Sequence, residues 1–173
     1  GPVIGITGSV GKTTTKEMVA AILHKKGLPL VTAGNLNNHL GVPLTLLQLS
    51  ACHDSAVVEM GASALGEIRY LTQMVKPSVA VVTAVAPAHV EGFGGVENVA
   101  IGKAEIFEGL QVGGTAVINL DNHYTAAWET HLAEKFRVLR YSVSENHHAV
   151  LPDVYAKKIR TGRDGVSFQL HKG

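Results

Sequence analysis

The start of the chain constrains the fold most, because an apolar segment (VIGIT) runs into a glycine-rich loop that ends on Lys-Thr-Thr. A strand, such a loop and a helix start form the context in which backbone N–H groups surround a phosphate. The strict pattern G-x-x-x-x-G-K-[ST] fails, because Ile6 stands where its first glycine belongs. What remains is a shorter loop, Gly8-x-x-Gly11-Lys12-Thr13.

We interpret this stretch as a phosphate-binding loop rather than a plain glycine-rich turn. Lys12 would reach the β- and γ-phosphates, and the Thr13 hydroxyl would bind Mg²⁺. The helix N-terminus adds its positive end to the site. The predicted cofactor-binding residues here are Gly8, Ser9, Val10, Gly11, Lys12, Thr13 and Thr14.

Strands and helices alternate along the chain, and the strands are apolar throughout. This pattern predicts an α/β fold, a mostly parallel sheet with helices on both faces, of the P-loop NTPase type. Strands are expected at 3–7, 30–32, 55–60, 79–84, 115–120 and 137–142. Helices are expected at 12–26, 43–49, 66–74, 96–110 and 124–135. The first helix would bury the face formed by Met18, Val19, Ile22 and Leu23.

The tail is predicted to form a β-hairpin, with strands at 154–159 and 166–170 around a Gly-rich turn. We therefore expect one domain over 1–173, with an α/β core at 3–142 and a hairpin extension at 150–173. Gly1-Pro2 could be a remnant of protease cleavage, in which case the first strand begins at Val3.

Composition excludes several classes of protein. A formal net charge of +1 argues against broad electrostatic binding to nucleic acid or membranes. Cys52 is the only cysteine, so no internal disulfide can form and a reducing compartment fits. No apolar run approaches the roughly 18 residues that span a bilayer, and no leader is expected at the start.

Polar residues follow several predicted strands, where ligands bind in an open parallel sheet. Glu59 closes an apolar strand and suits Mg²⁺, which we favour over a carboxylate satisfied only by nearby backbone donors. His89, in the loop after the next strand, is a weak signal on its own. Asn119, Asp121 and Asn122 lie at the end of the fifth strand, where Asp121 or Asn122 could cap the next helix or the amides could contact adenine.

Two further features point to the same edge. The loop after the second strand carries Asn35, Asn37 and Asn38, which could be turn chemistry or could hydrogen-bond a polar substrate. Lys103 interrupts the apolar stripe of the helix at 96–110. A core-facing lysine is costly unless it is paired or modified, although its stem could also cover the core while the ammonium reaches solvent.

These motifs together resemble the central ATPase domain of the Mur ligases, cytoplasmic amide-forming enzymes of bacterial peptidoglycan synthesis. The resemblance covers Val3 to about Leu170, and the short loop at the start is the form this family has. The stretches that carry it are TGSVGKTT, AGNLNNHLGVPLTLL, VVEMGASALGEI, AHVEGFGGVENVAIGKAEIFEGL, NLDN and DVYAKKIRTGRDGVSFQL.

The resemblance implies an ADP-forming ligase that uses ATP and Mg²⁺, with two metal sites. ATP would phosphorylate the terminal carboxylate of UDP-N-acetylmuramoyl tripeptide, which is otherwise a poor acyl donor. The amine of D-alanyl-D-alanine would attack the acyl phosphate, and the tetrahedral intermediate would collapse to an amide and inorganic phosphate. Phosphoryl transfer depends mainly on positioning and charge neutralisation.

The resemblance also implies roles for single residues. Lys12, Glu59, His89 and Lys103 would form the catalytic set, with Lys103 often carbamylated in this family. The metal ligands would be Thr13, Glu59, His89 and Lys103. The substrate would meet Asn35, Asn37 and Asn38, and adenine would meet Asn119 and Asn122.

The chain departs from the family in its extent. Mur ligases have an N-terminal domain for the UDP-sugar and a C-terminal domain for further ATP and amino-substrate contacts, so we expect a monomeric piece that is inactive alone. A different Mur or folylpolyglutamate-type ligase, or a non-catalytic nucleotide-binding module, stays open as an alternative. A P-loop kinase or GTPase is disfavoured, because no guanine-reading N-K-x-D is present and Lys103 would be unexplained.

Overall fold

The computed structural model describes residues 1–86, 90–144, 150–163 and 165–173. Its strands are β1 (Val3–Thr7), β2 (Pro29–Val31), β3 (Ser55–Glu59), β4 (Val79–Val82), β5 (Thr115–Asn119), β6 (Arg137–Ser142), β7 (Val154–Gly162) and β8 (Gly165–Lys172). Its helices are α1 (Lys12–Leu23), α2 (Gly41–Leu46), α3 (Glu67–Val75), α4 (Val90–Phe93), α5 (Val96–Ala104), the 3₁₀ helix η1 (Glu105–Gly109) and α6 (Thr125–Ala133).

The strands form one sheet in the order β2-β3-β1-β4-β5-β6-β7-β8. Neighbours pair in parallel from β2 to β7, and only β8 runs antiparallel, in a hairpin with β7. The fold class and the C-terminal hairpin predicted from the sequence are therefore confirmed. Because the parallel strands all end at the same edge, the loops after β1, β2, β3, β4 and β5 meet there.

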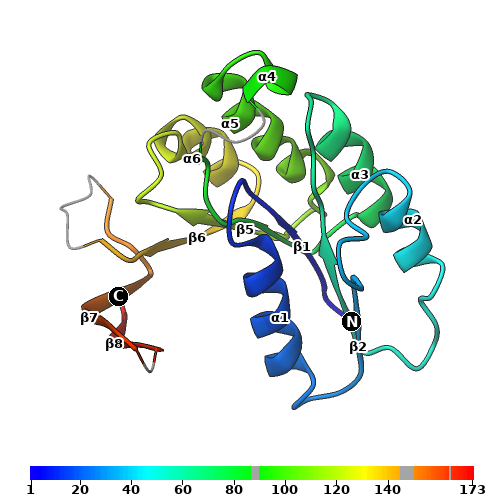
Figure 1. The fold of residues 1–173 in the computed structure, drawn as a ribbon, viewed down its shortest axis with the longest axis horizontal. Coiled ribbons are helices and arrows are strands. Elements are labelled where there is room, and N and C mark those ends of the chain that lie inside the picture. The colour runs from blue at the N-terminus through cyan, green and yellow to red at the C-terminus, as the bar shows by residue number, and fades with distance from the viewer. Residues whose placement is uncertain (87–89, 145–149, 164) are drawn as a thin grey trace.

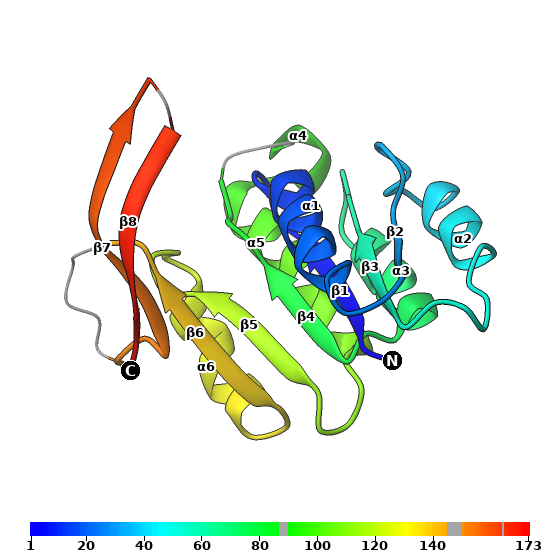
Figure 2. The same ribbon diagram turned by 90° about the horizontal axis from the view of Figure 1, so that it is seen from below.

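Helices cover the two faces of the sheet unequally (Figure 1, Figure 2). The helix α1 lies on one face, against a small core of Ile4, Ile6, Val57 and Val81. The larger core on the other face takes side chains from α2, α3, η1 and α6. The strand β3 is buried along its whole length, which explains the unbroken apolar run from Ala56 to Val58 at its centre.

The hairpin is joined to the rest of the sheet by a short stretch of pairing. Two pairs join β6 to β7, Tyr141 with Val154 and Ser142 with Tyr155. Beyond them the hairpin extends away from the helical layers, as Figure 2 shows for β7 and β8. Most of its residues are exposed.

The buried face of α1 corrects the sequence prediction. Met18 and Ile22 are about two-thirds exposed, at 65% and 64%, whereas Lys16 is fully buried. The inward stripe runs through Lys16, Val19, Ala20 and Leu23, with helical spacing of three and four residues. The prediction is confirmed for Val19 and Leu23 and was wrong for Met18 and Ile22, because it selected apolar residues and so passed over the lysine.

Other differences concern helix limits, and the helix predicted at 43–49 is α2 at Gly41–Leu46. The predicted helix at 96–110 is divided into α5 and η1, and α1 ends at Leu23 instead of continuing to residue 26. Within the described part of the chain, no helix has both the length and the apolar character needed to cross a membrane.

Candidate active site

The loop between β1 and α1 is tightly fixed by glycines and by its neighbour Thr83. Gly11 precedes the first turn of α1 with φ of 81°, and Gly8 has φ of 147°. A Cβ atom at Gly8 would collide with the Thr83 hydroxyl. The loop therefore needs glycine at position 8 for space and at both positions for backbone conformation.

Thr83, just after β4, links this loop to the neighbouring strands. Its hydroxyl lies 2.6 Å from the carbonyl oxygen of Val10, to which it donates, and 3.2 Å from that of Thr7. Its own carbonyl oxygen accepts from the Tyr141 hydroxyl at 2.8 Å and from the Asn119 amide at 3.2 Å. Burial, together with the charge of Asp121, raises the pKa of Tyr141 to about 12, so the phenol stays protonated and donates.

Lys12 begins α1 and folds back over the loop. Its ammonium donates to the carbonyl of Gly8 at 2.9 Å and lies 3.5 Å from that of Ser9. Gly11 has no side chain that could cap the helix, so the first turn of α1 keeps its N–H groups and the positive end of its dipole facing the loop. This arrangement can hold an anion at the helix N-terminus.

Glu59 ends β3 as a buried carboxylate, 1% exposed. Its Oε1 accepts from the Asn37 amide at 2.8 Å, and its backbone N–H donates to the Thr32 hydroxyl. Its Oε2 is also buried and has no hydrogen-bond partner among the described residues. A buried carboxylate oxygen without a donor fits a bound cation.

Lys103 is buried in α5, at 2% exposure, as its place in the apolar stripe predicts. Its ammonium donates to the Ala62 carbonyl at 3.2 Å and lies 5.1 Å from the centre of the Phe93 ring. Burial, and next the positive charge of Lys12, lowers the pKa of Lys103 to about 8, against the opposing effect of Glu67 and Glu105. A substantial share of this amine is therefore neutral in weakly alkaline solution.

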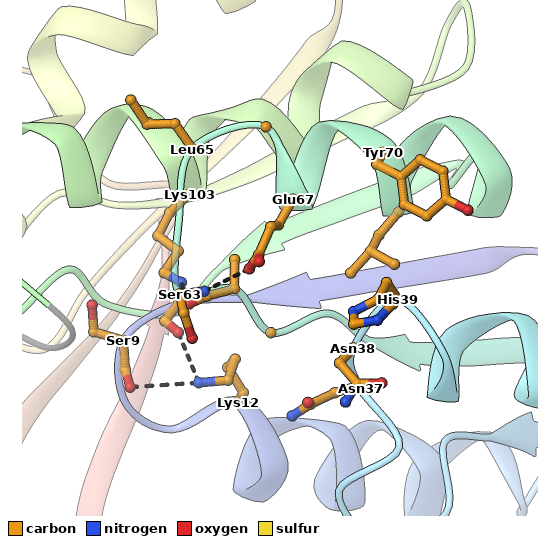
Figure 3. Close-up of a pocket in the computed structure, with 15 residues that line it drawn as sticks. Ser9, Lys12, Asn37, Asn38, His39, Ser63, Leu65, Glu67, Tyr70 and Lys103 are labelled. Atoms are coloured by element: carbon orange, nitrogen blue, oxygen red, sulfur yellow. Dashed lines mark hydrogen bonds between the residues drawn. The ribbon is translucent and has the colours of Figure 1, made fainter. Parts of the chain in front are cut away.

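Lys12, Asn37 and Lys103 line one pocket of about 600 Å³ at the carboxyl edge of the sheet. Figure 3 shows Lys12 and Lys103 toward one end, and His39 and Tyr70 toward the other. Asn37 lies between the two ends. The lining residues are Gly8, Ser9, Lys12, Asn37, Asn38, His39, Gly61, Ala62, Ser63, Leu65, Gly66, Glu67, Tyr70, Leu71 and Lys103.

Several predicted site residues lie outside this lining. Asn35 sits in the same loop as Asn37 but does not line the pocket, and Glu59 reaches it through Asn37. Asn122 lines a second hollow beside α6, while its Oδ1 accepts from the backbone of Tyr124 near the start of that helix. His89 lies outside the described residues.

The side-chain amides of Asn38 and Asn119 already form hydrogen bonds within the protein. Asn119 donates to Thr83 and accepts from the backbone of Asp121. Asn38 accepts from the backbone N–H groups of Leu40 and Gly41 and so caps α2. Each of these amides still has hydrogen-bonding capacity left, since an amide offers two N–H groups and two lone pairs.

Sequence reasoning missed the wall that follows β3. Ser63, Leu65 and Glu67 come from the loop after β3 and the start of α3, and Tyr70 comes from the next turn of that helix. The position of this segment directly after a central strand could have indicated it. The described residues hold no group of three or more His, Cys, Asp and Glu side chains suited to a metal.

Comparison with known proteins gives a consistent family. The family model for the Mur ligase middle domain matches residues 6–173. The UDP-N-acetylmuramoyl-tripeptide–D-alanyl-D-alanine ligase of Escherichia coli (strain K12) is 44% identical over 168 residues, which is 97% of this chain and 36% of that protein. The ligase of the same name from Bacillus subtilis (strain 168) is 44% identical over 115 residues, 66% of this chain and 25% of that protein.

Solved structures agree with this result. The chain matches a crystal structure of MurF from Acinetobacter baumannii with a TM-score of 0.90 and 37% identity, over 99% of this chain and 36% of that one. It matches MurF ligase from Thermotoga maritima in complex with ADP with a TM-score of 0.82 and 30% identity, over 98% and 38%. The chain thus spans about a third of the length of these relatives. It belongs to the Mur ligase family and matches that family's middle domain.

Proposed function

We propose that this chain is the ATP-binding domain of a ligase that joins D-alanyl-D-alanine to UDP-N-acetylmuramoyl tripeptide. The observation that carries the proposal is the meeting of Lys12, Lys103 and the Asn37–Glu59 pair in and beside one pocket. The names of the relatives support the substrates, and the ADP complex of the Thermotoga protein supports the nucleotide.

The reaction would proceed in two steps. The terminal carboxylate of the tripeptide attacks the γ-phosphorus of ATP, which releases ADP and gives an acyl phosphate. The amine of D-alanyl-D-alanine then attacks the acyl carbon, loses a proton and expels inorganic phosphate, leaving an amide. Phosphorylation turns a poor leaving oxygen into a good one, and the protein contributes position and charge.

The opening loop would bind the phosphates. Lys12 would exchange its contact with the Gly8 carbonyl for the β- and γ-phosphate oxygens, and the N–H groups of the loop and first helical turn would complete the binding site. The fixed backbone from Gly8 to Gly11 keeps these donors in place before the nucleotide arrives.

The residues present fit Mg²⁺, because Glu59 Oε2 is a buried oxygen without a donor and the Thr13 hydroxyl belongs to the adjacent helix start. We infer that Thr13 and Glu59 hold the first metal ion and that His89 and Lys103 serve a second. Mg²⁺, when bound, would neutralise phosphate charge during transfer. Asn37 would keep Glu59 oriented toward that position.

Lys103 would act as a carbamate. The ammonium would first lose one proton, and the neutral amine would then add CO₂ and lose a second proton to give a carbamate. A buried cation would thereby be replaced by an anion. Its lowered pKa supports this step by making the neutral amine available. Labelled bicarbonate should then give a carbamate carbon signal in the wild-type protein that Lys103→Met lacks.

The remaining assignments concern the substrates. Asn35, Asn37 and Asn38 would meet the carboxylate that receives the phosphoryl group. Asn119 and Asn122 would meet adenine, with whatever hydrogen-bonding capacity their contacts to Thr83 and Tyr124 leave. We further propose a single monomeric domain in the bacterial cytoplasm. It would be inactive in ligation without the parts that make up the other two-thirds of its relatives.

Calorimetric titration with Mg-ATP tests the proposal on the chain itself. Wild-type protein should bind, Lys12→Ala should lose at least about tenfold in affinity, and Lys26→Ala, at an exposed lysine after α1, should bind like wild type. Absence of binding by a folded wild-type chain would contradict a phosphate site within this domain. Amide ligation by the 173-residue chain alone would contradict its expected inactivity.

A further inference from the structure

We propose that Lys16 is a positioning residue that fixes the loop of residues 32–38, here called the asparagine loop, to the helix that carries Lys12 and Thr13. The proposal rests on the function proposed above. Lys16 has no part in that mechanism, yet it is the largest fully buried side chain of the described protein.

The contacts of Lys16 account for its burial. Its ammonium donates to the carbonyl of Thr32 at 2.9 Å and to that of Gly34 at 3.4 Å. It also lies 2.9 Å from a carboxylate oxygen of Glu17, whose side chain is mostly exposed. An ammonium has three N–H groups, so all of them are used, and a buried lysine with this many acceptors is tolerated.

The asparagine loop has no regular secondary structure to define its position. Short local turns shape it, from the N–H of Leu36 to the Ala33 carbonyl and from that of Asn37 to the Asn35 carbonyl. Gly34 has φ of 52° and open space around it, so the loop is not fixed by packing at that point. Its position therefore depends on hydrogen bonds and packing at other points along the loop.

The C-terminal end of the loop is held at Glu59 and Gly61, at the end of β3 and just after it. Asn37 donates to Glu59, and its carbonyl accepts from the N–H of Gly61 at 2.8 Å. The other end is held at Thr32, whose hydroxyl accepts from the N–H of Glu59 and whose carbonyl accepts from Lys16. Asn35 lies between these two anchors.

Lys16 therefore connects the phosphate-binding helix α1 to the asparagine loop, which is proposed to meet the substrate carboxylate. It lies one helical turn after Lys12, so α1 carries both the phosphate-binding lysine and the group that holds the asparagine loop. Transfer needs the carboxylate in line with the γ-phosphate, and a displacement of about 1 Å can cost about 100-fold in rate. Loss of Lys16 should disturb this alignment while leaving the phosphate loop intact.

The test compares Lys16→Met, Lys16→Gln and the matched control Lys26→Met in the full-length ligase. We expect Lys16→Met to lower kcat about 100-fold and to raise KM for the UDP-tripeptide, while the Kd for Mg-ADP stays within about threefold. The side chain in Lys16→Gln is uncharged and one bond shorter, so its N–H groups can replace only part of the contacts of the ammonium, and the variant should recover only part of kcat. Lys26→Met should match wild type, because Lys26 is exposed.

The outcomes separate this proposal from the one before it. An unsubstituted ligase that forms no ADP from its three substrates would overturn both. An active ligase in which Lys16→Met keeps kcat per folded molecule would overturn only the role of Lys16. That role would also be overturned if Mg-ADP affinity falls in step with kcat, or if Lys16→Met does not fold and Lys16→Gln has wild-type kcat.

Discussion

The side-chain amide of Asn37 donates to the buried carboxylate of Glu59 across 2.8 Å, and so joins the loop after β2 to the end of β3. Only one carboxylate oxygen is used in this way. The other is buried and has no hydrogen-bond partner among the described residues. A carboxylate held in this half-satisfied state is expensive for the fold alone, which suggests a role in binding a cation.

Glu59→Gln tests this interpretation. The glutamine oxygen can still accept from Asn37, and a neutral amide is easier to bury, so the free energy of unfolding should change by no more than about 1 kcal/mol. The Mg²⁺-dependent part of nucleotide affinity should fall at least about tenfold. Calorimetric titration with and without Mg²⁺ measures the two nucleotide affinities whose ratio is compared. Glu134→Gln, at an exposed position, is the control. If the Mg²⁺ dependence of nucleotide affinity is unchanged in Glu59→Gln, Glu59 is not a ligand of the proposed metal site.

Gly8→Ala should damage the phosphate loop more than Gly11→Ala does. A Cβ atom at Gly8 would collide with the Thr83 hydroxyl, whereas the nearest atom to one at Gly11 is 3.9 Å away. Both positions have positive φ, so each substitution should cost about 1–3 kcal/mol of backbone strain, and the collision adds to this only at Gly8. Urea unfolding of the two variants gives the difference. Equal losses would show that the Thr83 hydroxyl moves aside without cost.

The sequence was sufficient to predict those features of the structure that depend on a local pattern of residues. The apolar runs predicted β3 and β4, the glycine loop predicted the start of α1, and a lysine inside an apolar stripe predicted the burial of Lys103. Each of these signals lies within one element. Hydrophobic spacing and turn chemistry act over a few residues, so they can be seen without the fold.

The sequence was insufficient to predict hydrogen bonds between groups that lie far apart along the chain. Lys16 is buried because the carbonyls of Thr32 and Gly34, 16 and 18 residues away, accept hydrogen bonds from its ammonium, and the local sequence does not reveal these partners. Asn119 left two interpretations open, and the structure uses part of its amide to support Thr83, which lies 36 residues earlier. Hydrogen bonds of this kind depend on tertiary positions that periodicity does not encode.

Glu105 allows a test of how much a buried hydrogen-bond acceptor from a distant part of the sequence contributes to stability. This carboxylate is 2% exposed and accepts from the backbone N–H groups of Gly66 at 2.8 Å and Arg69 at 3.0 Å, so it caps the start of α3 from another helix. Glu105→Ala would leave both N–H groups without that acceptor and should cost about 2–4 kcal/mol of unfolding free energy. Denaturant titration measures the loss.

The matched control is Glu108→Ala. Glu108 forms a close ion pair with Arg69, at 2.6 Å, but its side chain is 46% exposed. An exposed pair is screened by solvent, so the loss should stay below about 1 kcal/mol. If the two variants lose equally, burial of the acceptor is not what makes Glu105 important.

Lys103 should give the protein a distinctive dependence on alkaline pH. Its pKa in the folded protein is about 8, below the ordinary lysine value of 10.5 that applies to the unfolded chain. Between these two values the unfolded chain binds more protons than the folded protein, so stability rises as the pH increases. Below pH 8 both states are protonated and the cost of burying the charge is present in full.

Lys103→Met removes this titration. At pH 7 the variant should be more stable than wild type, and the gap should close toward pH 10.5 by an amount on the order of 3 kcal/mol. Unfolding in urea at several pH values, in buffers free of bicarbonate, measures the gap, and Lys25→Met at an exposed position should run parallel to wild type. Parallel profiles for Lys103→Met would mean that the ammonium stays solvated in the folded state. A more stable Lys103→Met that also keeps full ligation in the full-length enzyme would mean that Lys103 is only a tolerated core lysine.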